Sequence, residues 1–229
     1  MTDMKKASDI FDTDSREKIR LAVTEAEKTT GGEIVPVAAT ASGRYDRAED
    51  IFGFVFALIG LSAVWLLCAG SHDEGNWAAT SMTTQLPLWA ALLILLVLFS
   101  LGAALATYFP SLKLPFITKA EMKAEVERAA AAAFHNFRAH GTASRVGVLI
   151  YVSLYERTAR VIADDSVADK VAPEAWAEVV ALITDGMAKG ASAEGMASAI
   201  AKCGETLCGP FPRPDGDVDE LSNELRIVD

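Results

Sequence analysis

Two stretches of the chain are apolar without interruption. Residues 51–70 (IFGFVFALIGLSAVWLLCAG) and residues 86–109 contain no Asp, Glu, His, Lys or Arg. At 1.5 Å per helical residue, 20 residues cover about 30 Å, which is the thickness of the hydrocarbon core of a bilayer. The alternative is a pair of buried core helices, but two such runs are hard to bury in a chain of 229 residues. We therefore predict two transmembrane helices.

The charges around these runs predict their orientation. The link between them, residues 71–85, contains Asp73 and Glu74 but no Lys or Arg. Basic residues lie outside the two runs, at Arg44, Arg47, Lys113, Lys119 and Lys123. Because Lys and Arg stay preferentially on the cytoplasmic side, we expect an external loop at 71–85 and both termini in the cytoplasm.

The segment before the first apolar run predicts one helix and one strand. A capping-box-like Asp14-x-x-Glu17 begins a predicted helix that Gly31 and Gly32 end, and a short apolar strand, Glu33 to Ala39, follows. The apolar face of the helix is formed by Ile19, Val23 and Ala26. Pro36 lacks a ladder donor, so this strand should lie at an edge or be paired on one side only.

The segment after the second run predicts three helices and two strands. A long helix should run from Thr118-x-x-Glu121 to about His140. Val146 to Leu154 is nearly all apolar and rich in β-branched residues, as in a strand buried on both faces, and Thr158 to Ala163 should form a hairpin with it. Helical spacing follows, from Pro173 to Gly190 and from about Ala193 to Leu207.

Neither segment can bury a core alone. We therefore expect residues 1–48 and 112–208 to form one α/β domain that the transmembrane hairpin interrupts, followed by an acidic tail at 209–229, extended over the surface or partly mobile. This requires Ile34 to Val37 to pair with part of Val146 to Leu154 or Thr158 to Ala163.

Charge and cysteine content narrow the function. The net charge is −10 and no basic stripe is visible, so nucleic acid is not an expected partner. The polar first 30 residues do not resemble a cleaved signal peptide. Cys68, Cys203 and Cys208 lack metal or redox spacing, and positions 203 and 208 point apart on a helix, so we expect reduced thiols.

Three segments of the chain resemble the TPM domain family, in its short bacterial membrane form. Gly32 to Val37 is similar to the family's "GEIVVV" strand, Val146 to Ser153 to its "GVLLLVS" strand, and Glu156 to Ile162 to its "DRRVRIEVG" strand. The resemblance covers residues 14–40 and 118–208, and the tail FPRPDGDVDEL is similar to the ending of the short members. It implies an αβα sandwich with the hairpin inserted after the first strand, in the bacterial inner membrane.

The resemblance also implies acid phosphatase activity and divalent cation binding by acidic residues after the third strand. Asp164 and Asp165 occupy that place, and carboxylates suit Mg²⁺ or Ca²⁺. Ligands gather at the carboxyl ends of strands in α/β sheets, which favours the same two residues. The alternative is that one of them caps the segment that follows. Here the chain has Ala163-Asp164-Asp165-Ser166-Val167 where the family often has a glycine-rich "VGYGLE".

Other candidates are weaker. Glu33 and Glu156 could assist a metal, although Glu156 lies at the other end of its hairpin from Asp164. Arg157 and Arg160 could meet a phosphate. His135 and His140 are five apart on one helix and so point in different directions, and the acidic run 215–220 lacks the glycine and glutamate of a calcium loop.

The sequence favours a membrane-anchored TPM-like domain that acts as a binding or accessory module at the cytoplasmic membrane face. Its partners would be the lipid bilayer and a membrane protein. The alternative is a divalent-cation-dependent, acid-phosphatase-like phosphoester hydrolase, with Asp164 and Asp165 as metal ligands and Ca²⁺ or Mg²⁺ as cofactor. A small transporter or channel subunit ranks third, because the apolar runs contain no charged residue.

Overall fold

The computed structural model describes residues 5–68, 86–137, 146–214 and 221–229. The chain separates into two compact units. The helical unit contains residues 44–118, and the sheet unit contains residues 5–43 together with residues from 119 to the end. The external loop predicted at 71–85, His140 and the acidic run 215–220 lie outside the described residues.

The sheet unit is built on four strands in the order β3-β2-β1-β4. β1 (Glu33–Ala39) and β2 (Gly147–Ser153) are parallel over their full length, from Glu33 opposite Gly147 to Ala39 opposite Ser153. β3 (Thr158–Ala163) is antiparallel to β2, and β4 (Arg226–Val228) is parallel to β1. The predicted pairing of β1 with β2 is confirmed, although the whole helical unit lies between them in the sequence.

Pro36 is accommodated without loss of a ladder bond. The amide of Glu33 donates to Val146 O at 2.8 Å, towards β2, whereas the amide of Ile34 faces the other way. Because direction alternates along a strand, position 36 also faces away from β2, on the side of β4. β4 begins opposite Val37, so Pro36 has no neighbour there to bond. The strand is internal in the sheet, but it is paired on one side only at the proline.

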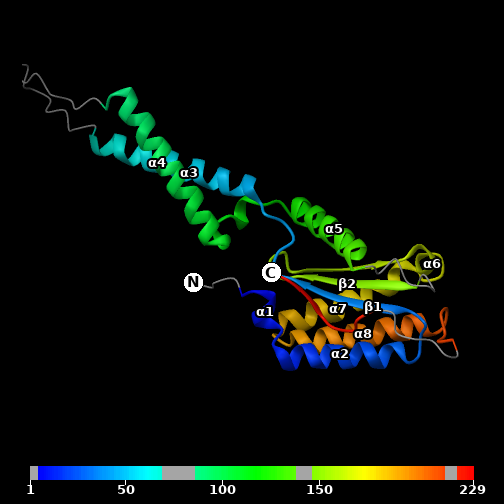
Figure 1. The fold of residues 1–229 in the computed structure, drawn as a ribbon. Coiled ribbons are helices and arrows are strands. Elements are labelled where there is room, and N and C mark those ends of the chain that lie inside the picture. Colours follow the sequence, from blue (N-terminus) through cyan, green and yellow to red (C-terminus); the bar gives the residue numbers. More distant parts are fainter. Residues whose placement is uncertain (1–4, 69–85, 138–145, 215–220) are drawn as a thin grey trace, which may run out of the picture. The chain divides into compact units, whose positions relative to one another are not determined.

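Helices cover both faces of the sheet (Figure 1). α2 (Thr13–Glu27), α7 (Pro173–Ala188) and α8 (Ser192–Cys208) pack on one face, against Ile34, Val148 and Ile150. α5 (Lys119–Asn136) packs on the other, where Val126 and Phe134 meet Val35, Val37 and Leu149. Alternate residues of β1 thus enter different cores, as the two-residue period of a strand requires. The sheet unit is a three-layer, mixed α/β sandwich.

The ends of the sheet unit contain two elements that the sequence pattern did not predict. α1 (Ala7–Ile10) buries Ala7, and the last residues form β4 rather than an extended surface tail. β4 is short and carries Arg226 at its start, so its composition gives little strand signal. A short helix, α6 (Asp165–Ala168), follows β3.

The helical unit is a pair of long apolar helices. α3 (Asp46–Cys68) begins five residues before the apolar run, because its first turn is polar, and α4 (Leu88–Tyr108) returns. Gly53 and Gly102 lie at their contact, and a Cβ at Gly102 would lie 2.9 Å from the Cα of Gly53. The two helices approach each other closely at these glycines, as small residues at a helix–helix contact allow. Two single-turn helices, Pro110–Leu112 and Leu114–Phe116, follow α4.

One ion pair lies at the polar end of this helical pair. Lys113 is only 8% exposed, and its Nζ lies 2.6 Å from Glu49 Oε1 and 3.1 Å from Arg44 O. The hydroxyl of Thr107 donates to the other oxygen of Glu49 at 3.0 Å. These contacts tie the first turns of α3 to the residues that follow α4.

Candidate functional site

The strand directions define two edges of the sheet with different chemistry. β1, β2 and β4 are parallel, so their carboxyl ends share one edge, which we call the carboxyl edge. The opposite edge, with the amino ends of β1 and β2, is the amino edge. β3 runs antiparallel to β2 and therefore ends at the amino edge. In open α/β sheets, ligands usually bind beyond the carboxyl ends of the parallel strands.

Asp164 and Asp165 lie at the amino edge, directly after β3. The amide of Asp164 donates to the carbonyl of Gly147, the first residue of β2, at 2.9 Å. The expectation that these two acids lie with the carboxyl ends of the parallel strands is therefore wrong, because β3 is the antiparallel strand. Glu156, which was set aside for its distance from Asp164, lies at the carboxyl edge instead.

Asp164 acts as the N-cap of α6. Its Oδ1 accepts a hydrogen bond from the amide of Asp165 at 2.8 Å, which is the alternative role left open by the sequence. Asp165 is exposed. In the part of the chain that the structure describes, no three His, Cys, Asp or Glu side chains are grouped as metal ligands. Metal binding by Asp164 and Asp165 stays a prediction.

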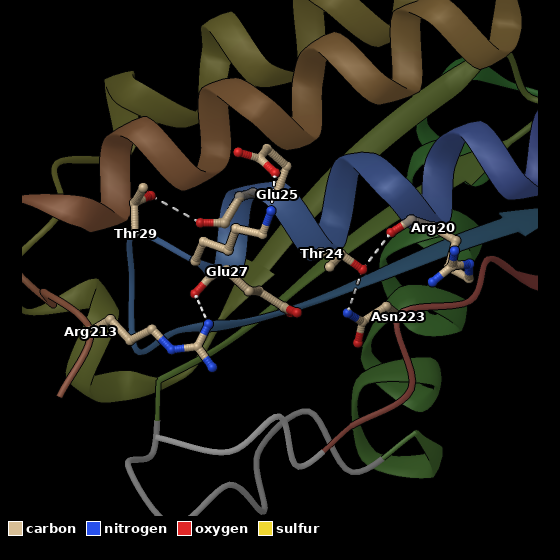
Figure 2. A network of polar contacts seen from close by, with 9 residues as sticks. Arg20, Thr24, Glu25, Glu27, Thr29, Arg213 and Asn223 are labelled. Atoms are coloured by element: carbon tan, nitrogen blue, oxygen red, sulfur yellow. Dashed lines mark hydrogen bonds and ion pairs between the residues drawn. The ribbon is translucent and has the colours of Figure 1, made fainter. Parts of the chain in front are cut away.

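Residues that follow α8 also contact α2 at the amino edge (Figure 2). Arg213 Nη1 donates to the backbone carbonyl of Glu27 at 2.9 Å, and Asn223 Nδ2 donates to Thr24 Oγ1 at 3.1 Å. The carboxylate of Glu27, 3% exposed, accepts from the amide of Ile34 at 2.9 Å. These bonds fasten residues 213 and 223 to α2, so the amino edge is held by structural contacts.

Two further side chains, those of Glu33 and Cys203, are held by contacts within the fold. Glu33, a candidate metal helper, is 7% exposed and accepts a hydrogen bond from the amide of Leu221 at 3.3 Å. Cys203 is fully buried on α8, and burial, with a smaller contribution from the charge of Glu27, raises the pKa of its thiol to about 12. All three cysteines are free, and Cys203 lies inside the core.

The carboxyl edge contains a buried chain of hydroxyl groups that ends at Glu156. Ser42 Oγ lies 3.1 Å from the hydroxyl of Tyr151 and donates to Ser153 Oγ at 2.8 Å. Ser153 in turn donates to Glu156 Oε2. The other oxygen of Glu156 accepts from the amides of Ser42 at 3.0 Å and Gly43 at 3.3 Å. Glu156, 7% exposed, therefore holds the segment that leaves β1.

The hydroxyl of Tyr151 is part of this hydrogen-bonded series, and its ring lies in the core between the sheet and α5. It is 2% exposed, and burial raises the pKa of its phenol; the charge of Glu156 acts in the same direction and the hydrogen bond with Ser42 opposes both. Ser42 and Tyr151 were not among the sequence-predicted site residues. The sequence offered only a weak signal for this site: Ser42 shortly after one apolar strand and Ser153 at the end of another. Serine is common at strand ends, so the pattern is not specific.

A second set of contacts at the same edge joins β1, β4 and α1. Thr40 Oγ1 donates to Asp229 Oδ1 at 2.7 Å and accepts from the amide of Ala7 at 2.7 Å. The amide of Ser8 donates to the same oxygen of Asp229 at 3.3 Å. Hydrogen bonds from Ser8 and Thr40 hold the pKa of the Asp229 side chain below its usual value.

A cavity of about 540 Å³ opens beside these groups. It lies between the β2–β3 turn, α1, the end of α7 and the start of α8. Apolar side chains form much of its wall, including Ile10, Ile183 and Met187. Arg157 and the hydroxyls of Thr158 and Ser192 are among its polar lining.

The two arginines of the β2–β3 hairpin differ in their surroundings. Arg160 pairs with Glu127 of α5, so it is not free for a phosphate. Arg157 is exposed and, within the described residues, forms no ion pair. Its backbone φ of +50° is in the left-handed region, as the last residue of the tight turn that begins at Leu154.

Comparison with known proteins supports the fold and nothing finer. No family model and no curated protein matches the chain. Among solved structures, the NMR structure of the BA42 protein from the psychrophilic bacterium Bizionia argentinensis sp. nov. is similar, with a TM-score of 0.55. The two chains are 19% identical, over 96% of this chain and 97% of BA42. At that identity the likeness shows a shared fold alone.

Proposed function

We propose that this chain is a membrane-anchored α/β protein whose sheet unit acts as a binding or accessory module at the cytoplasmic face of a bacterial inner membrane. The observation that carries the proposal is the exposure of α3 and α4. Only 11% of the most apolar 18-residue window of α3 and 6% of that of α4 is buried. A helix that is apolar all round and lacks a protein cover is expected in lipid.

The position of the helices in the fold supports the anchoring role. They are inserted between β1 and β2, and these strands nevertheless pair over their whole length. The sheet is therefore complete only when the chain has passed through both helices and returned. An even number of crossings returns the chain to the side it left, so one cytoplasmic domain is compatible with both sets of flanking basic residues.

A binding role agrees with the contacts at the carboxyl edge. Ser42, Ser153 and Glu156 are hydrogen-bonded to one another and to backbone amides, which fixes the shape of the edge. The nearby cavity offers a mainly apolar wall with an exposed cation, which is the composition of a ligand pocket. A TPM-like identity for the domain and a membrane protein as partner are parts of this proposal.

A phosphoester hydrolase is the second candidate, because one carboxylate oxygen of Asp164 could bind a cation. Asp164 Oδ2 is buried and, among the described residues, accepts no hydrogen bond. An oxygen of this kind could take a cation such as Mg²⁺ or Ca²⁺. Its neighbours give it little help, since Asp165 is exposed and Glu33 is bonded to Leu221.

Two measurements on the full chain separate the candidates. In lipid nanodiscs, hydrolysis of p-nitrophenyl phosphate is assayed with Mg²⁺ and with Ca²⁺, for the native chain and for Asp164→Ala with Asp165→Ala. The binding-module proposal expects no turnover that depends on these acids. Cation-dependent turnover that the double substitution abolishes would replace it with the hydrolase.

The partner is tested in intact cells with a photoreactive amino acid. One variant carries it in place of Lys189, which follows α7 beside the cavity, and a matched variant carries it in place of Lys28, after α2 and before β1; both positions are exposed. We expect the Lys189 position to cross-link to one membrane protein and the Lys28 position not to do so. Equal cross-linking from both positions, or none from either, contradicts a partner at the carboxyl edge.

A further inference from the structure

The cavity at the carboxyl edge has an unusual charge balance for this protein. The chain carries a net charge of −10, yet the residues that line the cavity include one cation, Arg157, and no acid. Arg157 is exposed to solvent, whereas Arg20, Arg128 and Arg160 each pair with a glutamate. A guanidinium that is left open at a cavity is a ready partner for a carboxylate or phosphate group.

The walls of the cavity call for an apolar body on the same ligand. Ile10 of α1 and Met187 of α7 are half-buried and contribute apolar surface, with Val152 and Ile183 buried behind them. Ser192 begins α8 at the rim. The N-terminus of α8 adds a weak positive potential there, with no side-chain cap on it. A volume of about 540 Å³ is within the range of small-molecule sites.

We propose that this cavity binds a small organic anion, with a carboxylate or phosphate head on Arg157 and an apolar body against Ile10 and Met187. The inference rests on the proposed function, since it names the ligand class of the binding module. Arg157 is a ligand-binding residue in this account. Arg160, three residues further along the hairpin in β3 and paired with Glu127, is its natural control.

The test is a titration of the full chain in nanodiscs, with empty nanodiscs as the blank. The probes are 4-phenylbutyrate and phenyl phosphate, which combine an anionic head with an aromatic body; 4-phenylbutanol and acetate each keep one half of that chemistry. We expect saturable binding of both anions in the millimolar range or tighter, and at least tenfold weaker binding of the two half-probes.

Three variants locate the site. Arg157→Gln should weaken both anions about tenfold to a hundredfold, because a charged hydrogen bond is lost, and Arg160→Gln should leave them unchanged. Ala188→Trp, at an exposed position on the cavity rim, should block both without touching Arg157. Thermal unfolding of each variant checks that it is folded.

The proposal is overturned if neither anion binds, if 4-phenylbutanol binds as tightly as 4-phenylbutyrate, or if Arg160→Gln matches Arg157→Gln. It is also overturned if folded Ala188→Trp binds normally. Membrane retention and cross-linking are measured on the same variants in cells. Loss of anion binding with both retained refutes the cavity alone, whereas anion binding by a chain that is not in the membrane refutes the proposed function alone.

Discussion

The proposed membrane role of α4 predicts a large effect from two charges near its centre. Leu93 and Leu96 are exposed, 54% and 63%, on one side of the helix. Lysine at both positions replaces two residues that favour insertion by two that oppose it, each at a cost of about 3–4 kcal/mol. Eleven Leu, Ile, Val and Phe residues of α4 favour insertion by about 3–7 kcal/mol in total. The double substitution therefore costs about 6–8 kcal/mol, enough to cancel the insertion of α4.

The matched control adds the same charge at the ends of the same helix. Leu88 and Tyr108, 75% and 79% exposed, are the first and last residues of α4, where a lysine can reach the lipid headgroups. The assay is the fraction of protein that stays with the membrane after a carbonate wash. We expect all three chains to resist the wash, because α3 still anchors the chain that carries Leu93→Lys and Leu96→Lys. A protease added to inverted vesicles should cleave the segment after α4 in the native chain and in the Leu88→Lys, Tyr108→Lys variant. It should leave that segment protected in the Leu93→Lys, Leu96→Lys variant, whose α4 does not insert.

If α4 were exposed to water instead of lipid, the lysine substitutions would have the opposite effect. There, exchanging exposed leucines for lysines changes stability by only about 0.5 kcal/mol per site and improves solubility. If the protease cleaves the central and terminal variants alike, or if the native chain is extracted by carbonate, the helices do not span a membrane and the anchoring proposal fails.

Three further outcomes test the contacts within each unit. Glu156→Ala leaves three hydrogen-bond donors without their acceptor and should lower the free energy of unfolding by about 2–4 kcal/mol in a urea titration. The control Glu127→Ala breaks an exposed ion pair and should cost less than about 1 kcal/mol. Equal losses would contradict the role of Glu156. Gly102→Leu forces atoms into the backbone of α3 and should lower the melting temperature of the chain in nanodiscs, whereas Ser100→Leu, on an exposed position, should not. The pKa of Asp229 is lowered in the folded state, so its contribution to stability is complete above the unfolded pKa of 3.8 and is lost as the pH falls through the folded pKa. Asp229→Asn should remove this loss of stability at acid pH. An unchanged dependence of stability on pH would refute the role of Asp229.

The parts of the fold that follow from periodicity could be predicted from the sequence. The apolar runs gave α3 and α4, and the β-branched run at Val146 gave a strand buried on both faces. The pairing of β1 with β2 followed from the need of β1 for a partner. These signals are local, and each is repeated over several residues, so they survive without knowledge of the tertiary structure.

The parts that depend on strand direction and on single contacts could not be predicted. The two acids after β3 fall at the amino edge because β3 is antiparallel to β2. The general rule that ligands bind at the carboxyl ends of strands applies to the parallel strands, and β3 is not one of them. β4 is only three residues long and is defined by its neighbour β1 rather than by its own composition. The role of Glu156 depends on Ser42, which is distant in sequence and arrives through the β1–β2 pairing.

The central claim is that one cytoplasmic domain is interrupted by two membrane crossings, and its most direct test is the side on which each segment is exposed. In a variant without native cysteines, single cysteines are placed at position 78 in the predicted external loop and in place of Lys28 and Lys189. A membrane-impermeant maleimide is then added to spheroplasts of intact inner membrane. We predict that the cysteine at position 78 is labelled at once and that the other two are labelled only after lysis. Labelling of either Lys28 or Lys189 position before lysis, or protection of position 78, would contradict the account.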